Sequence, residues 1–175
     1  KKRIHQIELF TKYPNDVQEE LLLRLINTAK NTEFGIEKEF TAIHKYTDFR
    51  KKVPIQQYET FEPLIERCRK GTQNLFWPTP IKWFAKSSGT TNAKSKFIPV
   101  SDDALEYCHL KAGKDMLCLY IHNNPKTQLF TGKGLRLGGS SEVYQDNGSH
   151  FGDLSAIITE NLPFWADFSS APSQQ

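Results

Sequence analysis

The segment AKSSGTTNAKSKFIPVS (residues 85–101) places a run of small polar residues between two stretches that have the character of β-strands. Four hydroxyl residues and Gly89 fill the five positions of SSGTT (residues 87–91), and Lys94 and Lys96 follow closely. A tight turn between strands needs only two or three small or polar residues. The loop therefore offers more hydrogen-bond donors than a turn requires, with a cation beside it.

The chemistry of this loop suits a polyphosphate. Glycine lets the backbone turn tightly or approach a ligand closely, and successive backbone N–H groups can form a concave anion site. Hydroxyl groups rotate to meet phosphate oxygens, and a lysine adds a charge-assisted contact. The candidate nucleotide-binding residues are Ser87, Ser88, Gly89, Thr90, Thr91 and Lys96. A plain turn whose hydroxyls bond their own backbone is the alternative, and the spacing of a Walker A loop does not occur.

Length and composition predict a soluble globular chain. The 175 residues are enough for one domain with a real core, and 38% of them are hydrophobic and 25% charged. A net charge of +3, with dispersed basic residues, argues against nucleic acid as a partner. No apolar run approaches the roughly 18 residues of a membrane span. Three cysteines without a CxxC pair fit a reducing compartment, so we expect a cytoplasmic protein without a metal cluster.

Residues 1–74 are predicted to be mainly helical. A helix is expected within residues 15–35, capped by Asp16, with an apolar stripe that includes Leu22 and Ile26. A short helix should begin near Thr47, and another should run from about residue 60 to residue 70. That last helix would have Pro63 in its first turn and would end at Gly71, as is typical of proline near the start and glycine after the end of a helix.

Residues 75–175 are predicted to mix strands with one long helix. IKWFAK (residues 81–86) and KFIPV (residues 96–100) should be strands on either side of the hydroxyl loop. Ser101 should cap a long helix that ends near His122. Short strand-like pieces follow, and Asn147-Gly148 signals a hairpin. The fold class expected is therefore mixed α/β. The remaining predictions are strands at TQLFTG, LRLGG and SEVYQ, a strand or short helix at LSAIITENLPFW, and a long-helix stripe of Ala104, Leu105, Cys108, Ala112, Met116 and Leu119.

The ordered sequence of the loop resembles a known motif. Ser-Ser-Gly-Thr-Thr, four further residues, lysine and then apolar-Ile-Pro is similar to the phosphate-binding motif of adenylate-forming enzymes. More narrowly, it resembles the GH3 family of acyl-acid amido synthetases, the auxin-responsive family of plants with bacterial relatives. KKVPIQQYETFEPLIERCRKG before the loop, and LRLGGS and FGDLSAI…NLPFW after it, also resemble that family. The resemblance covers most of the chain from about Val53 onward.

The resemblance implies an ATP-dependent ligase that forms carbon–nitrogen bonds. A carboxylic acid would be adenylated with ATP and Mg²⁺, and an amino acid would then displace AMP. SSGTT would line the β- and γ-phosphates, Lys96 matches the lysine of the motif, and the long helix from about Asp102 would form one wall of the acyl-acid pocket. Residues 1–175 would be the N-terminal part of the large adenylation domain, inactive without the remainder of the parent chain. No residue is assigned a catalytic role.

The chain departs from the family pattern in two ways: Ala93 supports an alternative function, and the absence of later motifs indicates an N-terminal portion. Family members usually carry glycine where this chain has Ala93, and alanine would be strained at a positive φ. The family's later motifs for adenine, ribose and metal are absent, since Ser140-Ser141-Glu142 follows glycines and lies too early. A non-catalytic nucleotide-binding module, supported by Ala93 alone, is one alternative. A structural fragment with an ordinary Ser/Thr/Gly turn is the other.

Overall fold

The computed structural model describes residues 2–87, 95–135, 142–164, 166 and 170–171. It divides the chain into two compact units, Lys1–Lys82 and Trp83–Gln175. The candidate loop lies in the second unit. Among the described residues, no helix is both long enough and apolar enough to span a membrane.

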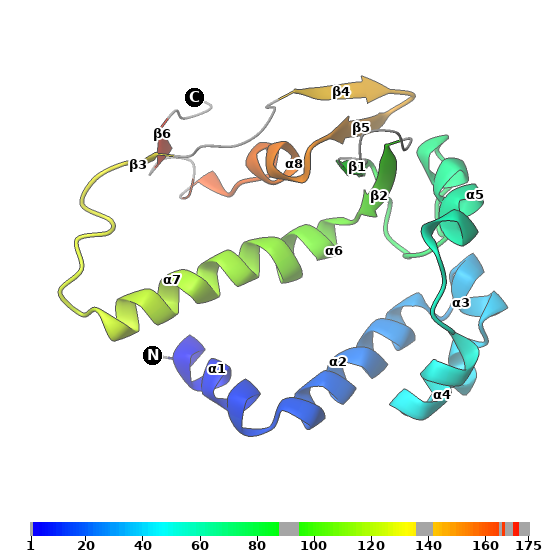
Figure 1. Cartoon of the computed structure of the whole chain (residues 1–175), viewed down its shortest axis with the longest axis horizontal. Helices are drawn as coiled ribbons and strands as arrows, with labels where there is room; N and C mark the ends of the chain where they lie inside the picture. Colours follow the sequence, from blue (N-terminus) through cyan, green and yellow to red (C-terminus); the bar gives the residue numbers. More distant parts are fainter. Residues whose placement is uncertain (1, 88–94, 136–141, 165, 167–169, 172–175) are drawn as a thin grey trace. The chain divides into compact units, whose positions relative to one another are not determined.

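The first unit is helical, as its sequence predicted (Figure 1). Its elements are α1 (Lys2–Lys12), α2 (Pro14–Ala29), α3 (Glu33–Glu37), the 3₁₀ turn η1 (Phe40–Ala42), α4 (Tyr46–Lys52) and α5 (Tyr58–Arg69).

Two helix starts in this unit differ from their predictions. Helix α2 begins at Pro14, and Tyr13 stands at its N-cap without a side-chain cap, so Asp16 lies in the first turn and is not the cap. Proline has a φ close to that of a helix. It also lacks an N–H group, which costs nothing at the first helical position because an N–H there would have no partner within the helix. Helix α5 begins earlier than expected, so Pro63 lies inside it. Gly71 ends α5 as predicted, with φ +98°.

The core of the first unit forms around the end of α2. Its buried apolar residues are Ile26, Ala29, Phe40 and Ile43. Thr32 is fully buried beside them. Its hydroxyl donates to the carbonyl of Ala29 at 2.7 Å and accepts from the N–H of Gly35 at 3.0 Å. One side chain thus satisfies the end of α2 and the start of α3, which fixes the bend between them.

An ion pair ties α3 to α5 within the same unit. The guanidinium of Arg67 donates to both carboxylate oxygens of Glu33, at 2.6 and 2.8 Å. The hydrogen bonds from Arg67, together with its charge, lower the pKa of Glu33 below its ordinary value of 4.5. Such bidentate pairs hold geometry better than single contacts.

Replacing this carboxylate should give a pH-dependent loss of stability. A carboxylate whose pKa is lowered in the folded state stabilises that state above the unfolded pKa, and this contribution disappears as pH falls through the folded-state pKa. Glu33→Gln should therefore unfold at lower urea concentration than the wild type at pH 7, and the difference should shrink as the pH falls below 4.5, the ordinary pKa of the carboxyl group. The measurement is the urea midpoint across this range. Glu20→Gln, at an exposed position on α2, is the control and should not change the midpoint.

The second unit combines a mixed sheet with helices. Its elements are β1 (Trp83–Ser87), β2 (Lys96–Val100), α6 (Asp102–Ala104), the π-helical segment η2 (Leu105–Leu110), α7 (Lys111–Asn123), β3 (Gly134–Leu135), β4 (Val143–Asp146), β5 (Ser149–Gly152), α8 (Leu154–Glu160) and β6 (Ser170–Ala171). The mixed α/β class predicted from the sequence is confirmed.

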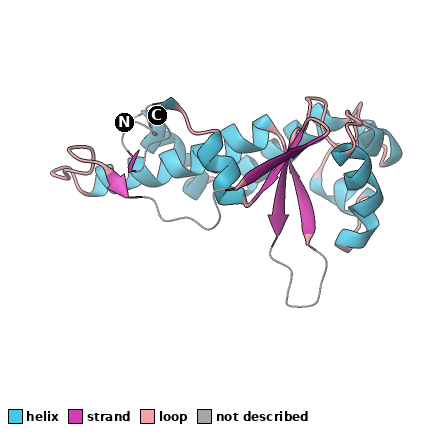
Figure 2. Cartoon of the chain, turned by 90° about the horizontal axis from the view of Figure 1, so that it is seen from above, coloured by secondary structure: helices cyan, strands magenta, loops and turns pink. Residues whose placement is uncertain are grey.

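The main sheet has the strand order β2-β1-β5-β4, and the strands are coloured magenta in Figure 2. Strand β1 is antiparallel to β2 and parallel to β5, and β4 is antiparallel to β5. The short strands β3 and β6 pair separately. One face of the main sheet is covered within this unit by α6, η2 and α8, through a core of Ala85, Val100, Leu105 and Ile157.

Local sequence signals predicted several of these elements. Both strands flanking the hydroxyl loop are confirmed, and Asn147 and Gly148 form the β4–β5 turn with positive φ, as the hairpin signal predicted. Residues 154–160 form a helix, which settles the strand-or-helix ambiguity. The strand predicted at residues 127–132 is wrong. That segment contains turns, closed by a bond from the N–H of Thr131 to the carbonyl of Gln128 at 2.9 Å.

The long helix is confirmed in extent but not in regularity. Ser101 caps it as predicted, accepting from the N–H of Ala104 at 3.1 Å. The helix then runs through η2 into α7, which ends at Asn123 (Figure 1). Of the apolar stripe predicted from the sequence, only Leu105 is buried. The π-helical segment interrupts the 3.6-residue period on which that stripe was based.

Candidate functional site

The candidate site is built at the loop end of the β1–β2 hairpin. The strands pair in antiparallel register, and Ser87 lies directly opposite Lys96 in the last pair before the loop. Directly opposed residues on antiparallel strands project on the same face. The hairpin therefore places a hydroxyl and an ammonium together at the two bases of the loop.

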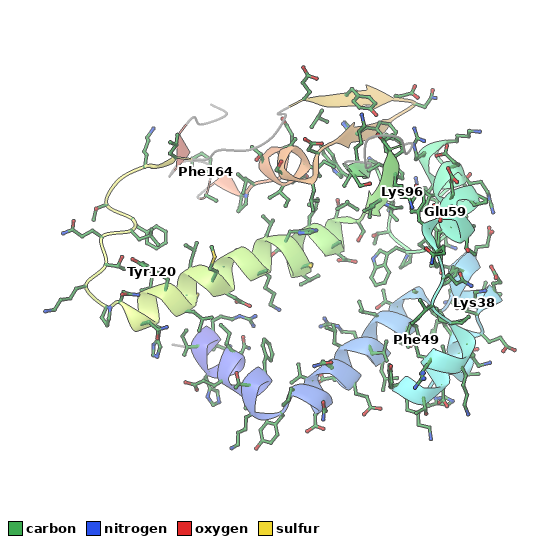
Figure 3. All side chains as sticks on the ribbon, viewed as in Figure 1. Lys38, Phe49, Glu59, Lys96, Tyr120 and Phe164 are labelled. Atoms are coloured by element: carbon green, nitrogen blue, oxygen red, sulfur yellow. The ribbon has the colours of Figure 1, made fainter. Side chains whose placement is uncertain are left out.

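Alternation along the strands separates Lys96 from its neighbour in the sheet, Lys86. Lys86 pairs with Phe97, one position before the Ser87–Lys96 pair, so Lys86 projects on the opposite face. Lys96 is half-buried, whereas Lys86 is exposed. Figure 3 shows Lys96 at the start of β2. Of these two lysines, Lys96 is the one that shares a face with Ser87.

The remaining predicted site residues are outside the described part of the chain. They are Ser88, Gly89, Thr90 and Thr91. Ala93, where the family usually has glycine, is also outside it. Ser87 and Lys96 are thus the two predicted residues that the structure places, and it brings them together.

A third polar residue reaches this edge of the sheet from a distant part of the sequence. Strand β5 runs parallel to β1, with Gly152 beside Ala85, so the carboxyl ends of both strands lie at one edge. Asp153 follows directly and stands at the N-cap of α8. Ligands of open α/β sheets commonly bind outside carboxyl ends where the connections diverge. Sequence reasoning did not single out Asp153, because only the β1–β5 pairing brings it here.

Gly152 is required for the strand spacing at this edge. A Cβ added to it would lie 2.9 Å from the carbonyl oxygen of Glu142 and 3.2 Å from Cγ2 of Val143. Strands β4 and β5 can therefore approach closely only because residue 152 has no side chain. The edge that holds Asp153 is tightly packed.

Stacked aromatic rings support the hairpin from the face opposite Lys96. The ring of Phe151 stacks on Phe84 with centroids 5.4 Å apart and on Tyr144 at 5.1 Å, and it meets Phe97 edge-on at 5.6 Å. Phe84 and Phe151 are both buried. Aromatic contacts of this kind add to the energy of burial. They connect the four strands of the sheet and make the hairpin a rigid base for a loop.

The described part of the site has the chemistry to bind a phosphate. An ammonium and a hydroxyl on one face can both donate to phosphate oxygens. Among the described residues, no group of three or more His, Cys, Asp or Glu side chains could hold a metal ion. Mg²⁺ commonly uses one or two carboxylates together with the phosphates of its nucleotide. Asp153 lies at the carboxyl ends of β1 and β5, where it could supply one such carboxylate.

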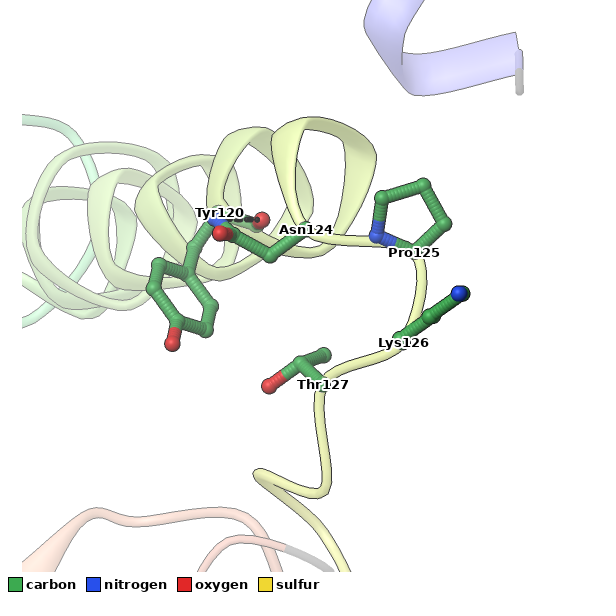
Figure 4. A pocket seen from close by; sticks show the side chains of 5 residues that line it. All are labelled: Tyr120, Asn124, Pro125, Lys126 and Thr127. Atoms are coloured by element: carbon green, nitrogen blue, oxygen red, sulfur yellow. Dashed lines mark hydrogen bonds between the residues drawn. The ribbon is translucent and has the colours of Figure 1, made fainter.

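A concave feature lies at the end of α7. It is an open depression of about 480 Å³, lined by Tyr120, Asn124, Pro125, Lys126 and Thr127 (Figure 4). The side-chain amide of Asn124 donates to the carbonyl of Tyr120 at 2.9 Å and so closes the helix end. Binding sites usually enclose a ligand between elements that supply converging polar groups. This depression is the corner of one turn, so the hairpin remains the better candidate.

Comparisons with known proteins agree with this architecture. The family model described as the GH3 family N-terminal domain matches residues 3–175. A jasmonoyl-L-amino acid synthetase of Nicotiana attenuata is 24% identical over 163 residues, which cover 92% of this chain and 28% of that protein. An indole-3-acetic acid-amido synthetase of Arabidopsis thaliana is 30% identical over 106 residues, which cover 60% of this chain and 19% of that protein.

Solved structures of the same family have a similar fold. The structure of the GH3.15 acyl acid amido synthetase superposes with a TM-score of 0.71 at 22% identity, covering 89% of this chain and 28% of that chain. A further structure is of AtGH3.15 in complex with 2,4-DB, with a TM-score of 0.63. The chain therefore spans less than a third of the length of these relatives.

Proposed function

This chain belongs to the GH3 family, and on that premise we propose that it is the N-terminal portion of an ATP-dependent acyl-acid amido synthetase. The complete protein would join a carboxylic acid to an amino acid. The proposal is supported by the relatives, which are a jasmonoyl-L-amino acid synthetase and an indole-3-acetic acid-amido synthetase. It is also supported by the Ser87–Lys96 pair, which is the single structural observation that carries it.

The reaction has two half-reactions. The carboxylate of the acid attacks the α-phosphate of ATP, which forms a carboxyl–phosphate bond and releases pyrophosphate. The amine of the amino acid then attacks the acyl carbon, which forms the amide and releases AMP. In the first step, negative charge increases on the leaving pyrophosphate. Preorganised donors aimed at that charge lower the barrier.

Each site residue has a role in that first step. The ammonium of Lys96 and the hydroxyl of Ser87, on one face, would hold the β- and γ-phosphates as charge develops. The same phosphates would also accept hydrogen bonds from the backbone N–H and hydroxyl groups of Ser88, Gly89, Thr90 and Thr91. Mg²⁺ would neutralise phosphate charge when bound, and Asp153 would be one of its carboxylate contacts.

We also propose a cytoplasmic location for the parent protein. All three cysteines of the chain are free thiols. Free thiols persist where the environment is reducing. The location is independent of the catalytic proposal and can be tested by fractionation.

The experiment that tests the proposed activity is ATP–pyrophosphate exchange by the full-length parent protein with a panel of carboxylic acids. We expect acid-dependent incorporation of labelled pyrophosphate into ATP, because acyl-adenylate formation is reversible. Adding an amino acid should then give an amide and AMP in equal amounts. Exchange at background with every acid tested would contradict the proposal.

The main alternative is a module that binds the nucleotide without chemistry. Ala93 supports it, since alanine in place of the family's glycine would restrict the loop. ATP binding by calorimetry without any exchange would favour this alternative. Unchanged ATP affinity after Ser88 and Thr90 are both changed to alanine would favour the third hypothesis, that the loop is only a turn.

A further inference from the structure

The turn between β4 and β5 consists of Asn147 and Gly148, which are both exposed (Figure 1). Asn147 has a φ of 49° and Gly148 a φ of 77°, and Asp146 pairs with Ser149 on either side of them. This is a two-residue hairpin turn of the kind that Asn-Gly favours. The same dipeptide also favours attack of the backbone on the asparagine side chain, because no Cβ screens the nitrogen of a glycine.

That attack converts asparagine to aspartate or isoaspartate without an enzyme. The backbone nitrogen of Gly148 loses its proton to a base and bonds to Cγ of Asn147, while the Cγ–Nδ2 bond breaks and the amide nitrogen takes up a proton and leaves as ammonia. Water then opens the resulting succinimide ring. If the new bond to Cγ breaks, residue 147 becomes an ordinary aspartate. If the bond to the main-chain carbonyl carbon breaks, the chain continues through Cγ and residue 147 becomes isoaspartate.

The side-chain amide of Asn147 is available for this reaction. Within the part of the chain that the structure describes, it makes no hydrogen bond. By contrast, the amides of Asn74, Asn124 and Asn161 donate to main-chain carbonyls, at 3.2, 2.9 and 2.8 Å. Leucine follows Asn74 and Asn161, and proline, which has no N–H, follows Asn124. Asn147-Gly148 is the one Asn-Gly pair in the sequence, so the reaction is least hindered in this turn.

The turn is placed where it can open without unfolding the rest of the unit. Strand β4 lies at one edge of the main sheet and, among the described strands, pairs with β5 alone. Val143 is half-buried, and the other residues of β4 are exposed. Segments with few buried contacts open at a lower free energy than the core. Opening releases Asn147 from the backbone conformation of the turn and lets the nitrogen of Gly148 approach Cγ.

We propose that Asn147 is a site of spontaneous conversion to isoaspartate, and that this modification releases β4 from the sheet. Isoaspartate adds one methylene group to the main chain. Because the loop length fixes the register of a hairpin, the lengthened turn can no longer join Asp146 to Ser149 as paired residues. The stack of Tyr144 on Phe151, with ring centroids 5.1 Å apart, depends on the same register. The modification therefore removes both the ladder and the ring contact that hold β4.

Ageing of the full-length parent at pH 8 and 37 °C, followed by peptide mass spectrometry, tests this proposal. We expect the peptide with residue 147 to lose the mass of ammonia and then gain that of water, ahead of peptides with Asn74, Asn124 or Asn161. Fragmentation should identify isoaspartate in the product. Hydrogen exchange of the same samples should show a loss of protection in β4 that grows with the isoaspartate fraction. Conversion should be faster at pH 9 than at pH 7, because the attacking nitrogen must lose its proton.

Asn147→Gly is the matched control variant. It removes the reactive amide and keeps a residue that adopts positive φ readily, and Gly-Gly also forms two-residue hairpin turns. After the same ageing, this variant should show no mass change at position 147. The protection of β4 from hydrogen exchange should also stay constant.

Several results would overturn the inference. They are an unmodified Asn147 after ageing, conversion of another described asparagine at an equal rate, and conversion to aspartate without isoaspartate. Isoaspartate at position 147 with β4 still protected would also overturn it, as would an equal loss of protection in Asn147→Gly. Neither readout uses catalysis, so a failure of pyrophosphate exchange would count against the proposed function alone.

Discussion

Changing Lys96 to methionine in the full-length parent should abolish most of its adenylation activity. Methionine keeps the length and the apolar stem of the side chain but removes the charge. Removing one preorganised donor to a developing negative charge costs about 2–4 kcal/mol, which is roughly 30- to 900-fold in rate. The measurement is the rate of acid-dependent pyrophosphate exchange at saturating ATP, with ATP affinity determined separately.

Lys86→Met is the matched control for this prediction. It removes the same charge ten residues earlier, from an exposed side chain on the other face of the same hairpin. Exposed substitutions away from a site usually change free energies by under about 0.5 kcal/mol, so exchange should change by no more than about twofold. Equal losses in the two variants would show that net charge near the loop matters, and would remove the specific role given to Lys96.

Changing Gly35 to alanine should be the most destabilising single substitution we expect in the first unit. A Cβ at Gly35 would lie 2.1 Å from the carbonyl oxygen of Ala29 and 3.0 Å from its carbonyl carbon. The clashing atoms belong to the backbone, so the clash cannot be relieved by a change of side-chain rotamer. The same carbonyl of Ala29 accepts a hydrogen bond from the hydroxyl of Thr32, which in turn accepts from the N–H of Gly35. Relieving the clash must separate α2 from α3, at a cost of about 3 kcal/mol or more.

Urea unfolding of the parent and hydrogen exchange measure this effect together. Exchange in peptides from residues 26–43 reports stability of this unit specifically, because different parts of a large protein open at different free energies. Gly132→Ala is the control, since a Cβ there would meet nothing within 4 Å. Equal protection from hydrogen exchange in the Gly35→Ala and Gly132→Ala variants would contradict the close approach of α3 to the end of α2.

The hairpin that carries the candidate loop could be predicted from neighbouring residues alone, and the phosphate-binding role of the loop stays a prediction. The order of hydroxyls, glycine and lysine indicated a phosphate loop, and flanking apolar runs indicated the hairpin that carries it. Ser101 as a helix cap and Asn147-Gly148 as a hairpin turn were predicted correctly for the same reason. Each depends on a few consecutive residues whose backbone preferences agree.

Other features depend on pairings between residues far apart in the chain, and the sequence does not encode these in any local pattern. Parallel pairing of β5 with β1 brings Asp153 to the edge that holds Ser87 and Lys96, across more than 50 residues of sequence. The π-helical segment likewise appeared in the sequence as part of a regular stripe, and only the structure separated Leu105 from Met116. By itself, the sequence determined the family-like loop, the hairpin and the mixed fold class, since propensity and periodicity act over short distances. Tertiary packing decided which face each lysine occupies and which carboxylate follows the strand beside β1. Burial and strand pairing select among arrangements that local backbone preferences leave equal in free energy.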